Sequence, residues 1–585
     1  MGATIEFAAG AVRGQLCSIP LFGALDEAAR AALETEIEWL SLPGGRTLFR
    51  EDEAGDALYV VLTGRLGVMI RGNDGRDILV ARVHAGETVG EMALLDGSSR
   101  SATVVALRDT ELLRLGKCSY ERLVERHPRS MLSLVLPLVR RLRHTTHRSG
   151  SEAPIRTVAL TPLDLGADQH RIARDLADAL STDGRRIQLL DCKSAGHPPQ
   201  WFNAVETASD LVIYCADRSD TPWTKLCLRQ ADRVLLVASS NSSFIAPRSL
   251  TDHAKHRHQP LDLVLLHDGC RSAGQSAEDW RKRLPVDLVC HVRLGNSDDL
   301  ARLARLLTGK AIGLVLSAGG ARGFSHLGVV RALRQAHIPI DVIGGCSMGA
   351  IVGAGVALEW DDAEIRERLR CAFVQSNPIN DYTLPFLSLA KGQKVAWLLE
   401  EHFGNIRIED MWRPFFCVSA NLTAGNLAVH RDGPLVPALR ASVSIPGLLP
   451  PVEMAGEVHV DGGMMNYLPV DVMRSLCGAV VAVDVASDPA FMPVGKASGL
   501  ASVWQFLRHG RMIPPIVGLL VRAATVSSEP LARAARRQAD ILFKPPLETV
   551  DLLDWAACDE AIDLGYRHAI EKLEHLDKTA LGGPW

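Results

Sequence analysis

The chain has 585 residues, which is more than a single hydrophobic core normally fills, so we expect three or four domains. Hydrophobic residues make up 47% of the chain and charged residues 23%, a globular composition that excludes a largely disordered protein. The net charge of −4 gives no electrostatic basis for nucleic-acid binding.

Short alternating segments, separated by turns that contain glycine, fill residues 40–115. Clear examples are residues 57–62, 66–70 and 78–80. Strands of this length at this spacing predict a small β-barrel.

A second pattern lies inside the predicted barrel, where residues 89–104 read V-G-E-M-A-L-L-D-G-S-S-R-S-A-T-V. This segment resembles the phosphate cassette of cyclic-nucleotide-binding domains, G-E-x-A-L followed after a short spacer by R-[AST]-A-x-V. The resemblance implies a jelly-roll-like barrel with a site for cyclic AMP or cyclic GMP. The residues that would form this site are Gly90, Glu91, Met92, Ala93, Arg100 and Ser101.

The side chains of this cassette suit such a ligand. Arg100 offers two parallel donors to a cyclic phosphate, and Glu91 can accept a hydrogen bond from a ribose 2′-hydroxyl. A short helix from Gly90 would add free N–H groups at its start. We favour binding over the alternative, a barrel that keeps its shape without a ligand. The segment does not separate cyclic AMP from cyclic GMP.

Residues 128–147 are predicted to form a helix, because apolar residues recur there at steps of three and four. Its basic end, residues 140–144, is either solvated or faces a partner. In this domain type the trailing helix often covers the nucleotide or pairs with a second copy, so we expect it to relay ligand binding and to be a candidate homodimer contact. The Ser-Gly-Ser-Glu linker at 149–152 follows, and we place the first domain at residues 1–148.

The next region, residues 149–309, is predicted to be an α/β module with a parallel sheet, because strand-like runs alternate with helical ones such as 170–180. This alternation argues against a DNA-binding helix-turn-helix. No phosphate-binding loop stands in it, so we interpret the module as a scaffold or an inactive relic of a nucleotide-binding fold. The strand-like runs are residues 157–160, 187–190, 211–214, 234–237 and 263–266.

The third region, residues 310–585, opens with an apolar run at 314–316 that leads into the glycine-rich turn S-A-G-G-A-R-G at 317–323. Exposed N–H groups where such a turn opens a helix can hold a developing oxyanion. Neither phosphate-loop fingerprint, G-x-x-x-x-G-K-[ST] or G-x-G-x-x-G, is met. The candidate oxyanion residues are Gly319, Gly320, Ala321 and Arg322.

A second glycine-flanked turn, G-C-S-M-G at residues 345–349, follows the largely apolar run 338–343. This is the pattern of a nucleophile elbow, in which Gly345 and Gly349 permit a tight turn that exposes Ser347. Similar turns of small residues also occur without catalysis. The elbow makes Ser347 the candidate nucleophile.

The candidate base is Asp461, which ends an alternating strand and is followed by Gly462 and Gly463. Asp-Gly-Gly is also common in ordinary turns. His459 is a competing base, since strand alternation places it on the same face as Asp461. His326, beside the glycine-rich turn, is expected to pack or cap locally.

Together the three motifs resemble the patatin-like phospholipases, whose pattern is a G-G-x-R-G loop, a G-x-S-x-G elbow and a D-G-[GA] motif. The likeness extends over residues 311–356 and 442–447, and Ala318 departs from it where a further glycine is common. The resemblance implies a catalytic dyad in which Ser347 attacks an ester carbonyl and Asp461 takes its proton. It also implies an α/β hydrolase domain with no catalytic cofactor.

The order of barrel, α/β module and patatin-like domain resembles the neuropathy target esterase family, specifically its shorter bacterial relatives with one nucleotide domain. That resemblance implies a carboxylic ester hydrolase that releases fatty acid from phospholipid or lysophospholipid and is controlled by a cyclic nucleotide. Two alternatives stay open. One is a nucleotide-sensing scaffold without turnover, and the other is an active esterase with a vestigial sensor.

Several features bear on localisation. The 12 cysteines form no C-x-x-C pair and no zinc-ligand spacing, so we expect reduced thiols and no metal site. No secretory signal and no window of eighteen uncharged apolar residues stand in the chain, which predicts a cytoplasmic protein. The apolar segment 512–521, bordered by arginines, would either dip into the inner face of the membrane or cover the active-site cleft.

Overall fold

The structure is a computed structural model that divides the chain into two compact units. The first unit holds Met1–Gln275 and Trp280–Leu288, and the second holds Ser276–Asp279 and Val289–Trp585. The domain limits at 148/149 and 309/310 stay predictions. The structure describes residues 26–71, 77–91, 97–127, 155–164, 169–182, 184–242, 250, 259–269, 277–384, 388–486 and 528–576.

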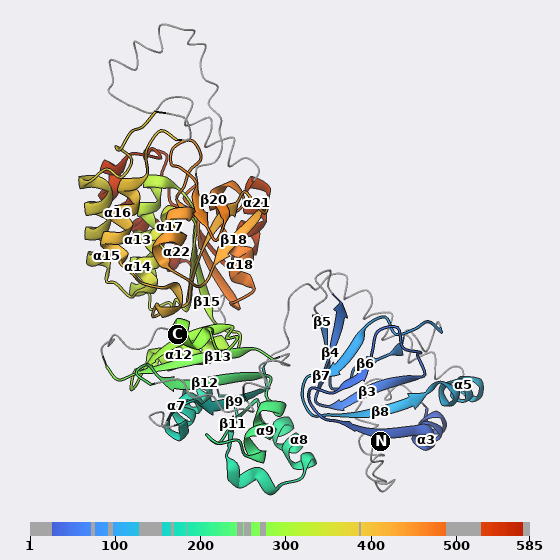
Figure 1. Ribbon diagram of the computed structural model, residues 1–585. Coiled ribbons are helices and arrows are strands. Elements are labelled where there is room, and N and C mark those ends of the chain that lie inside the picture. Colours follow the sequence, from blue (N-terminus) through green and yellow to red (C-terminus); the bar gives the residue numbers. More distant parts are fainter. Residues whose placement is uncertain are drawn as a thin grey trace. The chain divides into compact units, whose positions relative to one another are not determined.

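The first unit begins with a barrel of two four-stranded antiparallel sheets, in the orders β1-β8-β3-β6 and β2-β7-β4-β5 (Figure 1). Leu66 and Leu112 are fully buried in the core between the sheets, whereas Leu113 and Leu115 of β8 belong to a second cluster that includes residues of α3 and α5. The predicted jelly-roll-like barrel is therefore confirmed. Its strands are β1 (Ile37–Leu42), β2 (Thr47–Phe49), β3 (Ala57–Thr63), β4 (Arg65–Arg71), β5 (Asp77–His84), β6 (Thr88–Val89), β7 (Thr103–Ala106) and β8 (Thr110–Gly116).

Two helices, α3 (Glu27–Glu36) and α5 (Lys117–Arg126), pack on each other beside this barrel. The first is capped by Asp26, whose Oδ1 accepts a hydrogen bond from the Ala29 N–H at 2.7 Å. The helix predicted at 128–147 lies outside the described residues.

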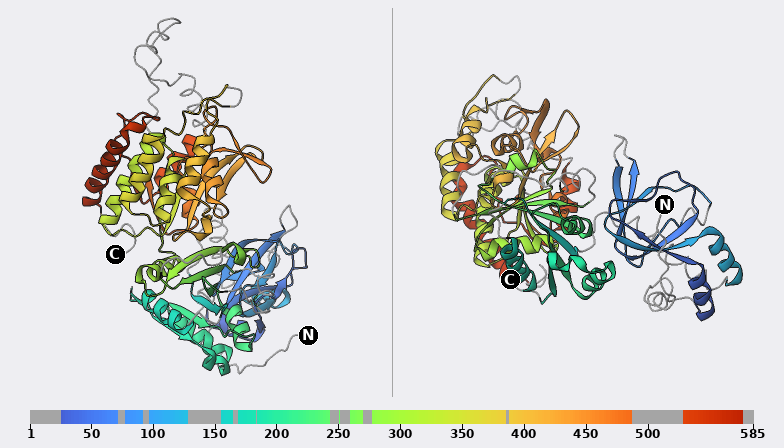
Figure 2. Two further views of the ribbon diagram at one scale, coloured as in Figure 1. Left: turned by 60° about the vertical axis from the view of Figure 1, so that its left-hand side comes forward. Right: turned by 60° about the horizontal axis from the view of Figure 1, so that its bottom comes forward.

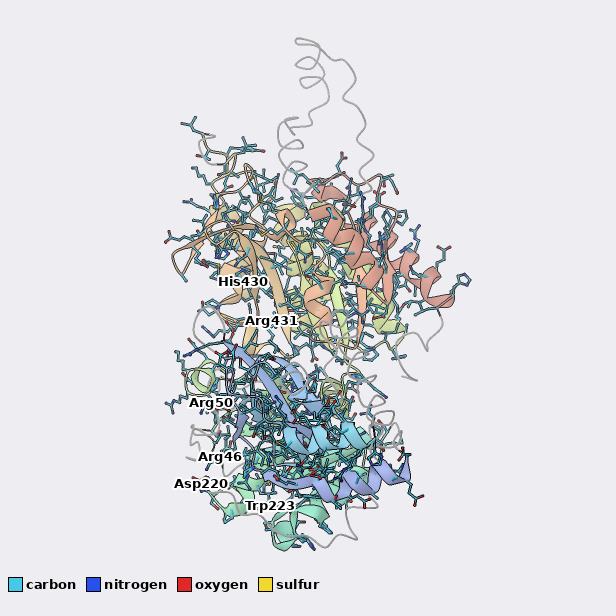
Figure 3. All side chains as sticks on the ribbon, turned by 90° about the vertical axis from the view of Figure 1, so that its right-hand side faces the viewer. Arg46, Arg50, Asp220, Trp223, His430 and Arg431 are labelled. Atoms are coloured by element: carbon cyan, nitrogen blue, oxygen red, sulfur yellow. The ribbon has the colours of Figure 1, made fainter. Side chains whose placement is uncertain are left out.

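The middle module has the parallel strands β10, β11, β9, β12 and β13 side by side in that order. The five predicted strands and the helix predicted at 170–180 are confirmed. Trp223 (Figure 3) fixes a helix to this sheet by donating its Nε1–H to the Cys215 carbonyl at 2.8 Å. The elements are β9 (Thr157–Pro162), α7 (Gln169–Ser181), β10 (Ile187–Leu190), η1 (Cys192–Gly196), α8 (Pro199–Ala208), β11 (Leu211–Cys215), α9 (Pro222–Gln230), β12 (Arg233–Ser239) and β13 (Leu261–His267).

A group of buried charges joins the barrel to the middle module within the first unit. Arg108, from the loop after β7, contacts Glu206 of α8 at 2.9 Å and Asp232 at 3.9 Å. Arg65 of β4 contacts the same Asp232 at 3.0 Å. All four side chains are at most 12% exposed, so each charge is compensated mainly by its partners rather than by water.

The second unit is built on an eight-stranded sheet in the order β19-β20-β17-β16-β15-β21-β22, with β18 paired to β17. Strands β15, β16, β17, β21 and β22 are parallel, whereas β18 and β20 run antiparallel to β17. The bounds are β15 (Ile312–Leu316), β16 (Val342–Gly345), β17 (Phe415–Asn421), β18 (Asn426–His430), β19 (Val452–Met454), β20 (Glu457–Asp461), β21 (Ala479–Val483) and β22 (Ile541–Phe543).

Helices cover both faces of this sheet, as Figures 1 and 2 show. One face carries the larger core, to which α13, α14, α15, α16, α17 and α22 contribute, and the other carries α18 and α21. The helices are α11 (Ala277–Arg281), α12 (Ser297–Leu307), α13 (Ser325–Gln335), α14 (Met348–Ala357), α15 (Asp362–Leu369), α16 (Gln393–Phe403), α17 (Leu435–Ser442), α18 (Val470–Arg474), α21 (Glu529–Gln538) and α22 (Cys558–Glu574). Shorter elements are β14 (Leu288–Arg293), η2 (Gly320–Phe324), η3 (Arg370–Gln375), η4 (Ile408–Asp410), η5 (Gly462–Met464) and η7 (Trp555–Ala557).

Helices α13 and α22 approach closely because each has a glycine at the contact. A Cβ atom on Gly328 would lie 2.0 Å from the Ile562 carbonyl oxygen, and one on Gly565 would lie 2.2 Å from the Ser325 carbonyl oxygen. Only hydrogen fits at both positions, so α22 is held directly against the helix that follows the glycine-rich turn.

In the described part of the chain, no helix combines the length and apolarity that a bilayer crossing requires. The segment 512–521, with its alternative roles at a membrane or over the cleft, falls outside the described residues.

Candidate active site

Ser347 occupies the sharp turn between β16 and α14, as the sequence predicts for a nucleophile elbow. Its backbone has φ 54° and ψ −124°, a conformation that a residue with a side chain seldom adopts. The Ser347 N–H donates to the Ser442 Oγ at 3.0 Å, which helps to hold the turn. The side chain is only 6% exposed and lies at the wall of a pocket.

The flanking glycines are required by close backbone contacts. A Cβ on Gly345 would lie 2.6 Å from the Gly349 carbonyl, and one on Gly349 would lie 2.3 Å from the Leu316 carbonyl oxygen. Any side chain at either position would force β15, β16 and α14 apart.

Asp461 reaches the elbow because β20 pairs with β17, the neighbour of β16 in the sheet. Its Oδ1 accepts a hydrogen bond from the Gly463 N–H at 2.7 Å, and the Cys346 Sγ lies 3.8 Å from the same oxygen. The Asp-Gly-Gly turn is tight, since a Cβ on Gly462 would lie 2.5 Å from the Val418 carbonyl oxygen.

Burial decides the protonation of this carboxyl. It raises the pKa of Asp461 to about 6, while the Gly463 N–H, the Ser347 hydroxyl and the Cys346 thiol each act to lower it. A carboxyl with a pKa near 6 is a stronger base than an exposed one and is still ionised at neutral pH.

The glycine-rich turn lies next to the elbow and is clamped by the segment between β22 and α22. The Ala321 N–H donates to the Leu552 carbonyl at 2.8 Å, and the Arg322 Nε donates to the Val550 carbonyl at 2.7 Å. Gly320 has φ 53°, and a Cβ there would lie 2.2 Å from the Leu552 oxygen. Of the candidate oxyanion donors, Ala321 is thus already engaged, whereas Gly319 and Gly320 make no backbone hydrogen bond as donors to a described residue.

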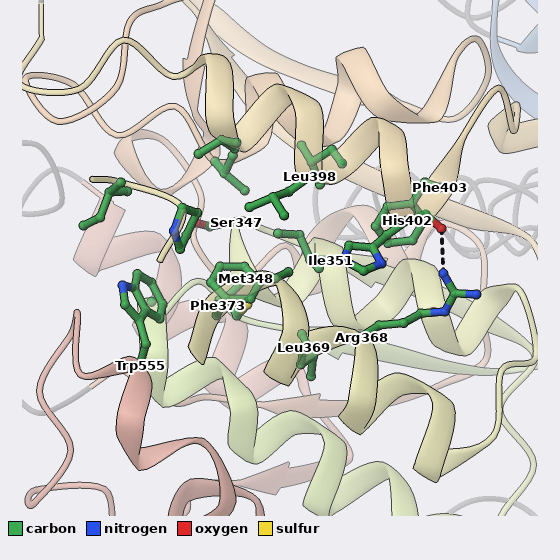
Figure 4. A pocket seen from close by; sticks show the side chains of 18 of the residues that line it. Ser347, Met348, Ile351, Arg368, Leu369, Phe373, Leu398, His402, Phe403 and Trp555 are labelled. Carbon is green, nitrogen blue, oxygen red and sulfur yellow. Dashed lines mark hydrogen bonds between the residues drawn. The ribbon is translucent and has the colours of Figure 1, made fainter. Parts of the chain in front are cut away.

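An apolar pocket opens at Ser347 and extends along α14 (Figure 4). It encloses about 910 Å³ of empty space, part of which is open to solvent. Ser347 and Trp555 lie toward one end of the view and His402 and Arg368 toward the other. Its walls come mainly from α14, α15, η3 and α16, including Ile351, Leu369, Phe373, Leu398 and Phe403.

His459, the competing base, has another partner. Its Nδ1 lies 2.9 Å from the Ser419 Oγ, and the Nε2 of His430 (Figure 3) lies 2.7 Å from the same oxygen. The Ser419 side chain is fully buried. His459 therefore belongs to a His–Ser–His network in the sheet, in which Ser419 and His459 are buried and His430 is partly buried. His326 is also fully buried and bonds through Nε2 to the Ser317 carbonyl at 2.9 Å, which agrees with the expected local packing role.

Some residues of the site belong to no catalytic motif of the sequence. Ser442 holds the elbow and the Ser444 carbonyl accepts from the Asp461 N–H at 2.9 Å, although the segment 442–447 was identified only through family likeness. Leu552 and Trp555 lie in a stretch without any motif. Among the described residues, no group of three or more His, Cys, Asp or Glu side chains could hold a metal ion.

In the barrel, Arg100 of the cassette is almost fully buried. Its Nη1 donates to the Gly90 carbonyl at 2.9 Å and its Nη2 to the Ala57 carbonyl at 2.8 Å, with the guanidinium 4.2 Å from the centre of the Phe49 ring. Gly90 has φ 84°, and a Cβ there would lie 2.4 Å from Arg100 Nη1. The structure thus brings Arg100 and Gly90 together, while Met92 and Ala93 fall outside the described residues.

Three family models match the chain, in the order of the three predicted domains. The cyclic nucleotide-binding domain model matches residues 39–127, the Neuropathy Target Esterase family P-loop like domain matches residues 190–296, and the patatin-like phospholipase model matches residues 314–474.

Curated relatives match nearly the whole chain. Patatin-like phospholipase domain-containing protein 7 of Rattus norvegicus is 28% identical and aligns with 92% of this chain and 45% of its own length. Lysophospholipase nte1 of Neurospora crassa is 29% identical over 93% of this chain and 42% of its own length. Patatin-like phospholipase domain-containing protein 6 of Homo sapiens is 29% identical over 92% of this chain and 44% of its own length. The chain spans less than half the length of these relatives.

Solved structures match shorter parts of the chain. The N-terminal domain of a transcriptional regulator from Streptomyces coelicolor A3(2) is 37% identical, with a TM-score of 0.20, over 22% of this chain and 89% of that one. A cyclic nucleotide-binding domain from Methylobacillus flagellatus is 24% identical, with a TM-score of 0.22, over 25% of this chain and 86% of that one.

Proposed function

We propose that this chain, a patatin-like protein with the domain order of the neuropathy target esterase family, is a serine lipid esterase that releases fatty acid from phospholipid or lysophospholipid. The observation that carries the proposal is a strained elbow that holds Ser347 beside a buried carboxyl at the opening of an apolar pocket. Such a pocket suits an acyl chain, and the elbow suits attack on its ester.

The reaction has two halves. The Ser347 Oγ attacks the ester carbonyl while its proton passes to Asp461, and the N–H groups of Gly319 and Gly320 stabilise the negative oxygen of the tetrahedral intermediate. The leaving alcohol takes the proton from Asp461, and an acyl-enzyme remains. Water then attacks this ester, again with Asp461 as the base, and the fatty acid leaves with Ser347 restored.

The substrate is proposed to be a membrane lipid, and a single-chain lysophospholipid in particular. Two of the relatives that match the chain are named lysophospholipases. The enzyme would work in the cytoplasm at the inner face of the membrane.

The catalytic test compares the wild type with Ser347→Ala and Asp461→Asn, using lysophospholipid vesicles and mass spectrometry of the released fatty acid. We expect each variant to lose roughly 10³-fold or more in kcat/KM. Ser475→Ala changes an exposed serine outside the pocket and should retain the wild-type rate. Equal rates for the wild type and Ser347→Ala would refute the catalytic role and leave the sensing scaffold as the alternative.

We also propose that a cyclic nucleotide binds the barrel and controls the esterase. Support comes from the match of residues 39–127 to the cyclic nucleotide-binding domain model and from the contact between Arg100 and Gly90, two residues of the cassette. The helix at 128–147 is the proposed relay and homodimer contact.

Calorimetric titration of cyclic AMP and cyclic GMP into the full chain tests this role. Arg100→Ala should abolish the heat of binding. Because Arg100 also holds two carbonyl groups, Glu91→Gln provides a milder variant that should weaken binding without disturbing the barrel. If neither nucleotide binds the wild type, the sensor is vestigial.

A further inference from the structure

The residue before the nucleophile, Cys346, lies against the carboxyl of the base. Its side chain is fully buried, and its Sγ is 3.8 Å from the Asp461 Oδ1, within the range for a sulfur donor. The pattern G-x-S-x-G leaves this position open, so nothing in the elbow itself requires a thiol here.

We propose that the Cys346 thiol is a positioning residue for the catalytic base, which it holds with one carboxyl oxygen turned toward Ser347. This proposal rests on the proposed esterase function. The geometry behind it is the distribution of donors around the carboxyl. Both the Gly463 N–H and the Cys346 thiol contact Oδ1, which leaves Oδ2 to take the proton of Ser347.

Toward Asp461 the thiol acts as a donor, while a hydrogen bond with the Ser442 hydroxyl acts to lower the pKa of Cys346. Burial and the neighbouring Asp461 raise the pKa of Cys346 well above its ordinary value, so the sulfur keeps its proton at neutral pH. A protonated thiol stabilises the ionised carboxylate, and it accordingly lowers the pKa of Asp461. A thiolate would repel the carboxylate instead.

A purely structural role is the alternative, since Cys346 also packs in the core cluster that contains Val418, Met473 and Cys477. The two roles predict different results. Loss of packing lowers stability only, whereas loss of a donor changes the protonation equilibrium of Asp461 and therefore the pH dependence of the reaction.

The experiment measures kcat/KM against pH for the wild type and for Cys346→Ala, Cys346→Ser and Cys477→Ala. Without the thiol, the acidic midpoint should rise by about 0.5 pH unit or more, because the ionised carboxylate loses a donor. A hydroxyl is a stronger donor than a thiol, so Cys346→Ser should move the midpoint in the opposite direction. Cys477→Ala removes a buried thiol from the same cluster and should leave the midpoint unchanged.

A second measurement does not depend on turnover. The infrared S–H stretching band of Cys346, isolated as the difference between the wild type and Cys346→Ala, should shift to higher frequency when Asp461→Asn removes the charged acceptor. An unshifted band, together with equal midpoints in folded wild type and Cys346→Ala, would overturn the proposal. An inactive wild type whose band still shifts would instead count against the esterase function alone.

Discussion

The protonation of a single carboxyl sets the acid limit of the proposed reaction. Asp461 must be ionised to accept the Ser347 proton, and burial raises its pKa to about 6. We therefore expect kcat/KM to be nearly constant above pH 7 and to fall about tenfold for each pH unit well below 6. A rate profile from pH 4.5 to 8.5 checks this expectation. A midpoint near 4, where an exposed aspartate titrates, would contradict a buried base.

Two histidines, the buried His326 and the partly buried His430, make the second unit sensitive to acid in another way. Burial lowers the pKa of His326 and of His430 to about 4. The unfolded chain binds these protons near pH 6.5, so their contribution to stability is complete above that pH and is lost as the pH falls toward 4. Denaturant unfolding at pH 7 and pH 5 should show a lower midpoint at pH 5, and His430→Gln should reduce the difference. An unchanged difference would mean that other groups cause the acid sensitivity.

At the scale of one element, helix α14 forms one wall of the pocket. Ser347, Ile351 and Gly355 follow one another at steps of four residues and all line the pocket. Eight residues of helix extend this wall about 12 Å from Ser347. A Cβ on Gly355 would lie 3.0 Å from the Trp360 ring and 3.2 Å from Ile365. Glycine at position 355 thus lets Trp360 and Ile365, which also line the pocket, pack closely against α14.

Gly355→Ala should consequently change selectivity for chain length. We expect kcat/KM for long-chain esters to fall roughly tenfold relative to short-chain esters, because the added methyl group would displace Trp360 and Ile365, which line the pocket where only the longer chains reach. Gly353→Ala is a matched control on the same helix, since its Cβ would lie 3.0 Å from Ile343 in the sheet and outside the pocket lining. A series of p-nitrophenyl esters measures the ratio, and an equal loss at every length would contradict the role of Gly355.

The sequence predicts those elements whose signal is local. The five strands of the middle module, the elbow around Ser347 and the strand that ends at Asp461 all follow from runs of a few residues. The contact that holds the glycine-rich turn could not be predicted in this way. Arg322 and Val550 are 228 residues apart, and no motif links the two positions. The same holds for Ser442, whose contact with Ser347 spans 95 residues.

At the scale of the whole molecule, buried ion pairs connect the barrel to the middle module within the first unit. Burial raises the pKa of Glu206, and its ion pair with Arg108 opposes that rise. Arg108→Ala would leave Glu206 and Asp232 buried without this cation, at a cost of about 3 kcal/mol in the free energy of unfolding. Arg229→Ala, whose partner Asp109 is partly exposed, should cost about 1 kcal/mol or less. Denaturant titration followed by tryptophan fluorescence compares the two, and equal small losses would show that the buried group contributes little.

The order of synthesis matters for the glycine-rich turn. Ala321 and Arg322 contact residues 550–552, and α13 packs on α22, so both contacts need segments that are made late. On the ribosome Ser347 emerges some two hundred residues before the stretch that secures its neighbouring loop. A nascent chain therefore carries Ser347 well before residues 550–552 can secure the glycine-rich turn beside it.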